Sequence, residues 1–369
     1  MRQGLRPLLP LSALVLALAA LVATSGPVSA ASDRSEPPRA VGRGIAPTFI
    51  QSGDEPLLFW QEASDTKAQG QAWIVRSRRV EGKWISSRVA GPLDFRGAVP
   101  ILYSVAVARN GTIGLAIALS GSEIAILLSH DAGASFARAG TVRSDSTVVA
   151  PRLFPNARGG WLLFVTQPLA GVMSTGPAGQ GEAAAAGGSP AASGAQAATG
   201  TEKGFSLDNT NSIQVAHSED GVTWSSPSAL VANDEGLVNN YIPYSLAYGG
   251  RDLVVFQHQV NGTEDAASHY ALYSKASEDG GVTWSKALPL TEYLEPGSQA
   301  ASKTPNHRYF DNQAPRLIES GGRLRIAWQR RDTRKREEDN RDNPVRIVTS
   351  TLDAGGRLET KDLLYISDP

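Results

Sequence analysis

The chain lacks cysteine altogether, and its 35 basic and 36 acidic residues leave a net charge of -1. Without cysteine it can form no disulfide and carry no lipid on an N-terminal thiol. A balanced charge without a basic stripe argues against nucleic acid as a partner. Beyond residue 30 no apolar run is long enough to cross a bilayer, so no later membrane span is expected.

The first residues are typical of an export signal. Arg2 and Arg6 form a basic start, residues 8–23 are an almost unbroken apolar stretch, and Val28-Ser29-Ala30 offers a small-residue cleavage site. An uncleaved membrane anchor is the alternative, but the cleavage motif and the turn-forming Ser25-Gly26-Pro27 favour a cleaved signal.

We therefore expect a signal peptide over residues 1–30, a lead segment over 31–45 and a secreted or periplasmic protein. An exported protein without disulfides must rely on a large hydrophobic core. The remaining 339 residues (369 minus 30) are enough to build one.

One phrase, Ser-x-Asp-x-Gly-x-Ser/Thr-aromatic, recurs along the chain. Asp and Ser side chains accept hydrogen bonds from amides just ahead, and Gly adopts the positive φ of a tight reversal. The closing aromatic residue begins the next strand with a large apolar surface. We call these segments the Ser-Asp turns: residues 129–136, a copy shorter by one residue at 218–224, and 277–284. The residues expected to build them are Ser129, Asp131, Gly133, Phe136, Ser218, Asp220, Gly221, Trp224, Ser277, Asp279, Gly281 and Trp284.

A longer pattern surrounds the turns: Pro, an apolar stretch, a Gly turn and a strongly apolar run. Two β-rich runs joined by a Gly turn are typical of a hairpin, and Pro at the start of a strand loses no ladder bond. With a Ser-Asp turn and the strand that follows it, each repeat makes a four-stranded antiparallel sheet. The prolines stand at 47, 100, 151, 243 and 315, which gives steps of 53, 51, 92 and 72 residues.

We predict an all-β fold, a β-propeller of five four-stranded blades in a single domain over residues 46–369, or six blades if a degenerate one escapes detection. The first blade has no complete Ser-Asp turn but keeps Trp84 at the place of the closing aromatic, and the fifth has only an echo at 351–355. The expected blades lie near residues 46–97, 98–146, 149–235, 241–296 and 313–366.

Two segments fall outside this pattern. Residues 170–204 are rich in Ala, Gly and Ser, so they bury too little surface to stay ordered, and we expect a disordered insert. Residues 330–346 are densely charged with both signs, which favours a solvated loop between the second and third strands of the fifth blade. Both loops belong to the face of a propeller that usually carries ligands.

The Ser-Asp turn resembles the Asp box, or BNR repeat, of the sialidase superfamily and of other secreted β-propellers. In that family the box is a structural hairpin between the third and fourth strands of a blade, on the face away from the ligand. The resemblance implies a structural role for the turns rather than metal binding or acid/base chemistry, and no metal or cofactor is expected.

The catalytic residues of sialidases are not matched in the same way. Those enzymes hold the substrate carboxylate with three arginines and use an Asp acid and a Tyr activated by a Glu. The first arginine belongs to an aromatic-Arg-Ile-Pro phrase, and the matching segment here is Gly44-Ile45-Ala46-Pro47, with Ile45 in the place of the arginine. Arg43 is two residues early, and side chains alternate along a strand, so it need not substitute. Arg152 and Arg316 follow their prolines at equivalent positions, which suits a repeated structural role as readily as a site.

Polar and aromatic residues gather near the ends of strands in the last two blades. Aromatic faces with polar neighbours suit a sugar ring, and the guanidinium fork suits a carboxylated sugar. Asp311 and Asp332 could act as an acid/base pair only if their carboxyls lie ~5–10 Å apart. The candidate ligand-binding residues are Tyr241, His258, Arg308, Asp311, Arg330 and Asp332.

Two functions stay open. The first is an exported sialidase-like propeller that binds glycans or another extracytoplasmic ligand without the arginine triad. The second is a glycoside hydrolase, most plausibly an exo-sialidase. Ile45 favours the first, whereas three arginines meeting at the mouth of the central channel would favour the second.

Overall fold

The computed structural model describes parts of the chain from Gly44 onward, and we call these residues the described part. The expected signal peptide, almost all of the lead segment, the insert at 170–204 and Arg308 lie outside it, so the statements about them stay predictions. No helix in this part is long and apolar enough to cross a membrane. The described residues are 44–53, 55–63, 69–96, 101–120, 122–144, 149–168, 211–232, 235, 237, 239–260, 269–291, 310–332, 345–359 and 364–365.

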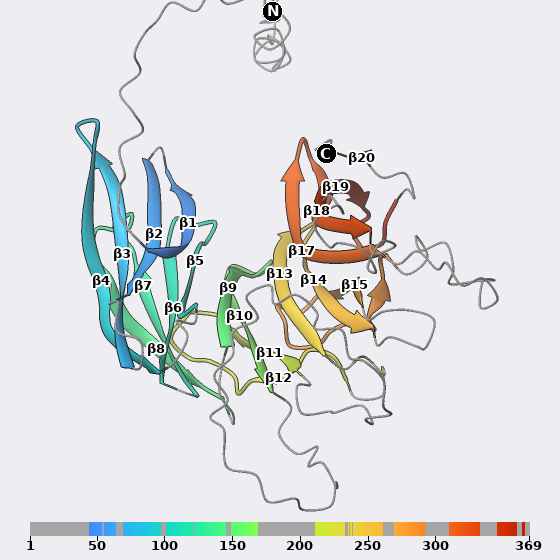
Figure 1. Cartoon of the computed structure of the whole chain (residues 1–369), viewed down its shortest axis with the longest axis horizontal. Coiled ribbons are helices and arrows are strands. Elements are labelled where there is room, and N and C mark those ends of the chain that lie inside the picture. The colour runs from blue at the N-terminus through green and yellow to red at the C-terminus, as the bar shows by residue number, and fades with distance from the viewer. Residues whose placement is uncertain are drawn as a thin grey trace, which may run out of the picture. The chain divides into compact units, whose positions relative to one another are not determined.

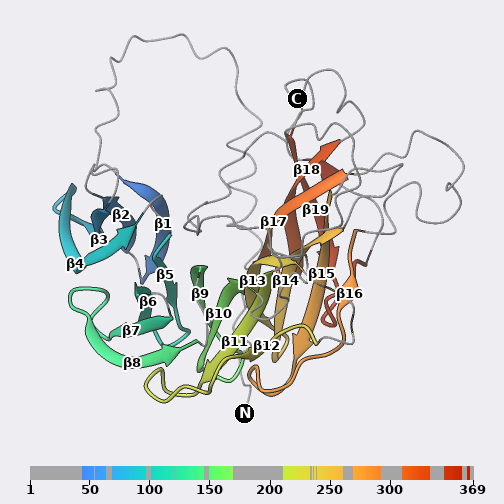
Figure 2. The ribbon, with the colours of Figure 1, turned by 60° about the horizontal axis from the view of Figure 1, so that its bottom comes forward.

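The described strands form five antiparallel sheets of four strands, and consecutive strands are neighbours within each sheet (Figures 1 and 2). This confirms the all-β fold and the count of five blades, which we number 1 to 5 in chain order. Blades 1 and 2 consist of β1 (Ile45–Ser52), β2 (Glu55–Ala63), β3 (Gln69–Val80), β4 (Lys83–Arg96), β5 (Tyr103–Val107), β6 (Ile113–Ser120), β7 (Glu123–Ser129) and β8 (Ala137–Arg143). Blades 3 to 5 consist of β9 (Val149–Pro155), β10 (Trp161–Pro168), β11 (Asn211–Ser218), β12 (Ser228–Ala229), β13 (Asn240–Tyr248), β14 (Arg251–Val260), β15 (His269–Ser277), β16 (Leu288–Pro289), β17 (Phe310–Ser320), β18 (Arg323–Asp332), β19 (Val345–Leu352) and β20 (Leu364–Tyr365).

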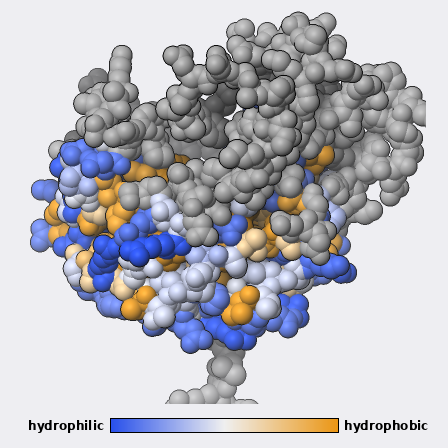
Figure 3. Space-filling view, turned by 90° about the horizontal axis from the view of Figure 1, so that it is seen from below, coloured by the Kyte–Doolittle hydropathy of each residue, from blue (hydrophilic) through white to orange (hydrophobic). Residues whose placement is uncertain are grey.

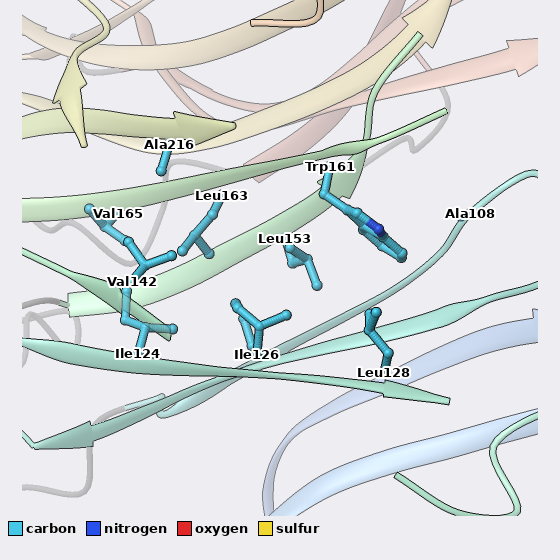
Figure 4. Packing of buried hydrophobic residues seen from close by; sticks show 11 residues of the cluster. Ala108, Ile124, Ile126, Leu128, Val142, Leu153, Trp161, Leu163, Val165 and Ala216 are labelled. Atoms are coloured by element: carbon cyan, nitrogen blue, oxygen red, sulfur yellow. The ribbon is translucent and has the colours of Figure 1, made fainter. Parts of the chain in front are cut away.

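A cluster of buried hydrophobic residues lies at each junction from blade 1 through blade 5. Between blades 2 and 3, Ile126 of β7 packs with Leu163 and Val165 of β10 (Figure 4). The alternate residues of β10, Leu162 and Phe164, pack instead with blade 4. Because successive side chains of a strand point to opposite faces, a blade with two neighbours buries both. This explains why the second strands are continuous apolar runs.

On the face seen in Figure 3, hydrophobic residues form separate spots among hydrophilic ones. Such scattered apolar residues are ordinary on a protein surface.

Four of the first strands share an unusual backbone just before the repeated proline. Ala46, Ala150, Ile242 and Ala314 have φ values of 52°, 49°, 48° and 50°. This left-handed conformation is uncommon for residues other than Gly, and more so for a β-branched residue such as Ile242. The pairing register of each strand shifts at this point, so the sheet contains a bulge there. The bulge therefore determines on which face of the strand the side chain after the proline lies.

In the Ser-Asp turns the carboxylate lies within a set of hydrogen bonds. Asp279 accepts hydrogen bonds from the hydroxyl of Ser277 at 2.8 Å and from the amide and hydroxyl of Thr283 at 2.9 and 2.6 Å. Asp131 and Asp220 accept corresponding bonds in blades 2 and 3. Burial by itself would raise the pKa of Asp279, but the hydrogen bonds outweigh it and lower that pKa to about 2.

Each of these turns also packs on the blade before it. A Cβ at Gly281 would collide with Leu162 of blade 3, and one at Gly133 would press on Leu57 of blade 1 at 2.8 Å. In blade 5 the expected echo forms a similar turn, since Asp353 accepts from the amides of Gly355 and Arg357, both at 2.8 Å. The turns therefore join neighbouring blades as well as neighbouring strands.

Candidate ligand site

The residues after the repeated prolines occupy equivalent places on the first strands. After each bulge, regular pairing with the second strand of the same blade resumes at one residue. These residues are Thr48, Arg152, Tyr244 and Arg316. First strands of consecutive blades contact one another, so these positions line the centre of the fold. The proline repeat thus places side chains from different blades around one axis.

Three of these side chains form a group that we call the central cluster: Arg152, Tyr244 and Arg316. The guanidinium carbon of Arg316 lies 5.1 Å from the centre of the Tyr244 ring, within the range of a cation–π contact. Phe154 packs edge-on against the same tyrosine with ring centres 5.1 Å apart. Nη1 of Arg316 donates a hydrogen bond to the carbonyl of Pro315 at 2.8 Å, which fixes the guanidinium.

The central cluster concentrates positive charge. Burial lowers the pKa of Arg152, and the positive charge of Arg316 lowers it further. Within the described residues neither arginine forms an ion pair with an acidic side chain. Two partly buried cations without a counter-charge repel each other, and an anion between them would relieve that repulsion. As far as the chain is described, the charges of two arginines act on each other here, rather than three.

A second group lies at the start of the first strands of blades 4 and 5. Tyr241 of β13 meets Tyr270 of β15 edge-on, with ring centres 6.0 Å apart. Asp311 of β17, which is 9% exposed, accepts a hydrogen bond from the amide of Tyr270 at 3.1 Å. Burial raises the pKa of Tyr270, and Tyr241 and Asp311 add to that effect. We call Tyr241, Tyr270 and Asp311 the rim cluster; it brings together two of the predicted residues.

His258 lies beside this group, but its side chain already has contacts within the fold. Its Nδ1 is 3.2 Å from Oδ1 of Asn240, and its ring meets Tyr273 edge-on at 5.6 Å. At 8% exposure it has little surface to offer a ligand.

The other two candidates in the described part of the chain, Arg330 and Asp332, lie in the last residues of β18. Arg330 was expected in a solvated charged loop, but β18 continues to Asp332, and Arg330 is a strand residue that is only 7% exposed. Its strand partner is Asn312, whose Oδ1 accepts from the indole of Trp328 at 2.9 Å. Asp332 pairs with Phe310 in the backbone ladder, and its proposed acid/base partnership with Asp311 stays a prediction.

Sequence reasoning missed Tyr244 and Tyr270. Tyr244 carries a signal in the sequence, because it follows Pro243 as Arg152 and Arg316 follow their prolines. Tyr270 carries none, since its contact with Asp311 joins residues 41 positions apart. In the described residues no group of three His, Asp or Glu side chains could hold a metal ion.

Comparison with known proteins gives similarity of fold only. No protein-family model matches the chain, and no curated protein does. Among solved structures, an alpha-L-arabinanase from Penicillium chrysogenum in complex with arabinobiose shares 14% identity, with a TM-score of 0.43, over 86% of this chain and 90% of its own. A protein of unknown function from Dyadobacter fermentans shares 12% identity (TM-score 0.45; 85% and 91% covered). An alpha-L-arabinofuranosidase from Fusarium graminearum shares 11% identity (TM-score 0.45; 84% and 88% covered). Similarity at this level does not extend an activity to the chain.

Proposed function

We propose that this protein is an exported, sialidase-like Asp-box propeller that binds a glycan bearing a carboxylate. The observation that carries the proposal is the central cluster, in which the charges of Arg152 and Arg316 act on each other beside Tyr244 and neither forms an ion pair with an acidic side chain in the described residues. The predicted export signal and the three Ser-Asp turns support the extracytoplasmic and sialidase-like parts of the proposal.

The chemistry of the cluster suits an acidic sugar. A guanidinium offers two parallel N–H donors to a carboxylate, and partial burial strengthens that bond. Tyr244 and Phe154 supply aromatic surface for the apolar face of a sugar ring, while Asp311 and Tyr241 at the rim offer partners for hydroxyl groups. A carboxylate bound between Arg152 and Arg316 would also neutralise their mutual repulsion.

Binding is favoured over hydrolysis because Ile45 stands where sialidases carry the first arginine. Its side chain is apolar and 41% exposed, so it offers a carboxylate no hydrogen bond. Exo-sialidase activity is the second candidate, and the rim cluster is what favours it. There a carboxylate, Asp311, lies next to two tyrosines, of which Tyr270 has a raised pKa.

Calorimetric titration with carboxylated sugars tests the proposal. N-acetylneuraminic acid and glucuronic acid are expected to bind, and glucose and the methyl ester of the neuraminic acid much more weakly. Arg316→Ala and Arg152→Ala should each weaken binding at least tenfold, because a charge-assisted hydrogen bond contributes about 1.5–3 kcal/mol. Arg323→Ala, which removes an exposed arginine at the start of β18, is the matched control and should leave binding unchanged.

Equal affinity for the acid and its ester, or no binding of either acid, would contradict the proposal. The same preparations are assayed with a fluorogenic sialoside. Turnover that disappears in Asp311→Asn, while folding is retained, would establish the hydrolase instead of the binding protein.

A further inference from the structure

The third strand of blade 1 carries a buried positive charge at the junction with blade 2. Arg76 of β3 is only 7% exposed. Ala72 and Ile74 of the same strand pack in the cluster between blades 1 and 2, and alternate residues of a strand share a face, so Arg76 also faces blade 2. A Cβ at Gly133, in the Ser-Asp turn of blade 2, would lie 3.9 Å from Cδ of Arg76. The guanidinium therefore lies beside that turn.

The place that Arg76 holds is uncharged in three other blades. Arg76 pairs with a second-strand residue, which in turn pairs with the residue after the repeated proline. By the same pairing, Val215, Ser274 and Thr349 hold this place in blades 3, 4 and 5. All three are buried, and none carries a charge. The packing of one blade on the next therefore does not require a cation here.

Most of the hydrogen-bonding capacity of this guanidinium is unused. Nη2 of Arg76 donates a hydrogen bond to Oγ of Ser87 at 2.9 Å. Nε and Nη1 are buried and have no hydrogen-bond partner among the described residues. Burial lowers the pKa of Arg76 and the positive charge of Arg78 lowers it further, while the negative charge of Asp131 opposes them. A buried cation with unsatisfied N–H groups is costly, and an acceptor with negative charge would remove that cost.

The nearby carboxylate of Asp131 does not serve as this acceptor. Its oxygens accept hydrogen bonds from Ser129 and Ser135 within the Ser-Asp turn, at 2.6 to 2.9 Å. Arg78 lies two residues after Arg76 on the same face, and within the described residues neither arginine forms an ion pair with an acidic side chain. Two guanidinium groups and one carboxylate leave an excess of positive charge at this junction.

The guanidinium of Arg76 lies close to the molecular surface. Ser87, which accepts its one hydrogen bond, is an exposed residue of β4. The Ser87 hydroxyl still has its own hydrogen to donate. Ile85, which pairs with Arg78, is 51% exposed. A small solute can therefore approach the two arginines from the side of β4.

We propose that Arg76, Arg78 and Ser87 form a binding site for a free inorganic oxyanion of the size of phosphate or sulfate. The anion would accept hydrogen bonds from the unused N–H groups of Arg76 and from the Ser87 hydroxyl, with Arg78 as the second positive charge. Because Nε and Nη1 lie below the surface, the Ser87 side chain turns aside on binding and only a small ion fits. The site belongs to blades 1 and 2, whereas the central cluster belongs to blades 3 to 5.

Thermal unfolding of the full-length protein in low millimolar phosphate tests the site. Chloride is exchanged for phosphate at constant pH and ionic strength, and the low concentration keeps general salt effects small. Phosphate at ten times its Kd should raise the melting temperature by about 2 °C, because it binds only the folded state. Arg76→Met should lose this shift and still fold, since other blades carry uncharged residues at this place. Arg79→Gln is the matched control: it removes an exposed arginine of the same strand and should keep the full shift.

The outcomes also separate this site from the central cluster. Arg316→Ala should keep the phosphate shift; a shift lost in Arg316→Ala but kept in Arg76→Met would place the anion in the central cluster and overturn the proposal. So would the absence of a shift in the native protein. If Arg76→Met fails to fold, Arg78→Gln and Ser87→Ala replace it and should each weaken phosphate binding about tenfold. Native affinity in both variants would overturn the proposal. No sugar enters these measurements, so they are independent of the proposed glycan binding.

Discussion

At the scale of single residues, one buried carboxyl gives the junction between blades 3 and 4 a dependence on pH. Asp252 is 0% exposed, and its Oδ1 accepts a hydrogen bond from the amide of Ala157 at 2.7 Å. Its Oδ2 has no hydrogen-bond partner among the described residues. Burial raises the pKa of Asp252 to about 6, although the Ala157 amide and nearby arginine charges oppose the rise. Ile113 and Trp161 occupy the same place in blades 2 and 3, so these two blades fill it with apolar residues.

Asp252→Asn should therefore stabilise the protein at neutral pH. In the unfolded chain Asp252 titrates near 4, so between about pH 4 and 6 folding takes up a proton, and above pH 6 the folded state bears the full cost of a buried charge. We expect the variant to be more stable than the native protein by about 1–3 kcal/mol at pH 7.5, and this advantage to shrink at pH 5. Urea unfolding at the two pH values measures it, with the exposed Asp94→Asn as control. The same difference at both pH values would contradict the assignment.

At the scale of elements, repeated short phrases determine most of what the sequence predicts. The Ser-Asp turns and the proline pattern locate the five four-stranded sheets, because turn chemistry is local and recurs in each blade. The bulge before the proline could not be predicted, since Ala46 and Ile242 have no local preference for a left-handed backbone. Consequently the sequence shows that Arg152 and Arg316 are equivalent, but not that they lie together.

Asp279→Ala should destabilise blade 4 without affecting the ligand site. The change removes acceptors for Ser277 and Thr283, and lost turn hydrogen bonds of this kind cost about 1–3 kcal/mol. Because the pKa of Asp279 is lowered, the contribution of the native carboxylate should persist above pH 4 and disappear as the pH falls toward 2. Thermal unfolding measures the loss, and Glu219→Ala, at an exposed position of the blade 3 turn, is the control. A variant of native stability that no longer binds carboxylated sugars would place the turn at the ligand site.

At the scale of the whole molecule, the candidate site depends on contacts that no local pattern encodes. The rim cluster needs Asp311 of blade 5 against Tyr270 of blade 4, and the central cluster needs blades 3, 4 and 5 together. Composition and loop chemistry pointed to blades 4 and 5, where the rim cluster lies, but His258 already contacts Asn240, and Arg330 is buried within its strand. What the site requires is that neighbouring blades be held firmly to one another.

A buried ion pair contributes to this between blades 3 and 4. Nζ of Lys275 in β15 lies 2.5 Å from Glu235 and 2.8 Å from the carbonyl of Leu230, which follows the last strand of blade 3. The two charged side chains are only 4% and 12% exposed. Glu235 also accepts a hydrogen bond from the amide of Ala287 at 2.6 Å, so the connection between the blades is tied to the outer edge of blade 4.

Removing one partner of this pair should cost far more than removing both. Glu235→Ala leaves the Lys275 ammonium buried without its counter-charge, and we expect a loss of about 3–5 kcal/mol in the free energy of unfolding. Glu235→Leu with Lys275→Met should recover most of that loss, because apolar residues of similar size replace a desolvated pair at little cost. Glu62→Ala, which breaks the exposed pair with Arg88, should cost less than about 1 kcal/mol. Urea unfolding followed by fluorescence measures all three. Equal losses in the single and double variants would mean that the junction depends on the shape of these side chains rather than on their charges.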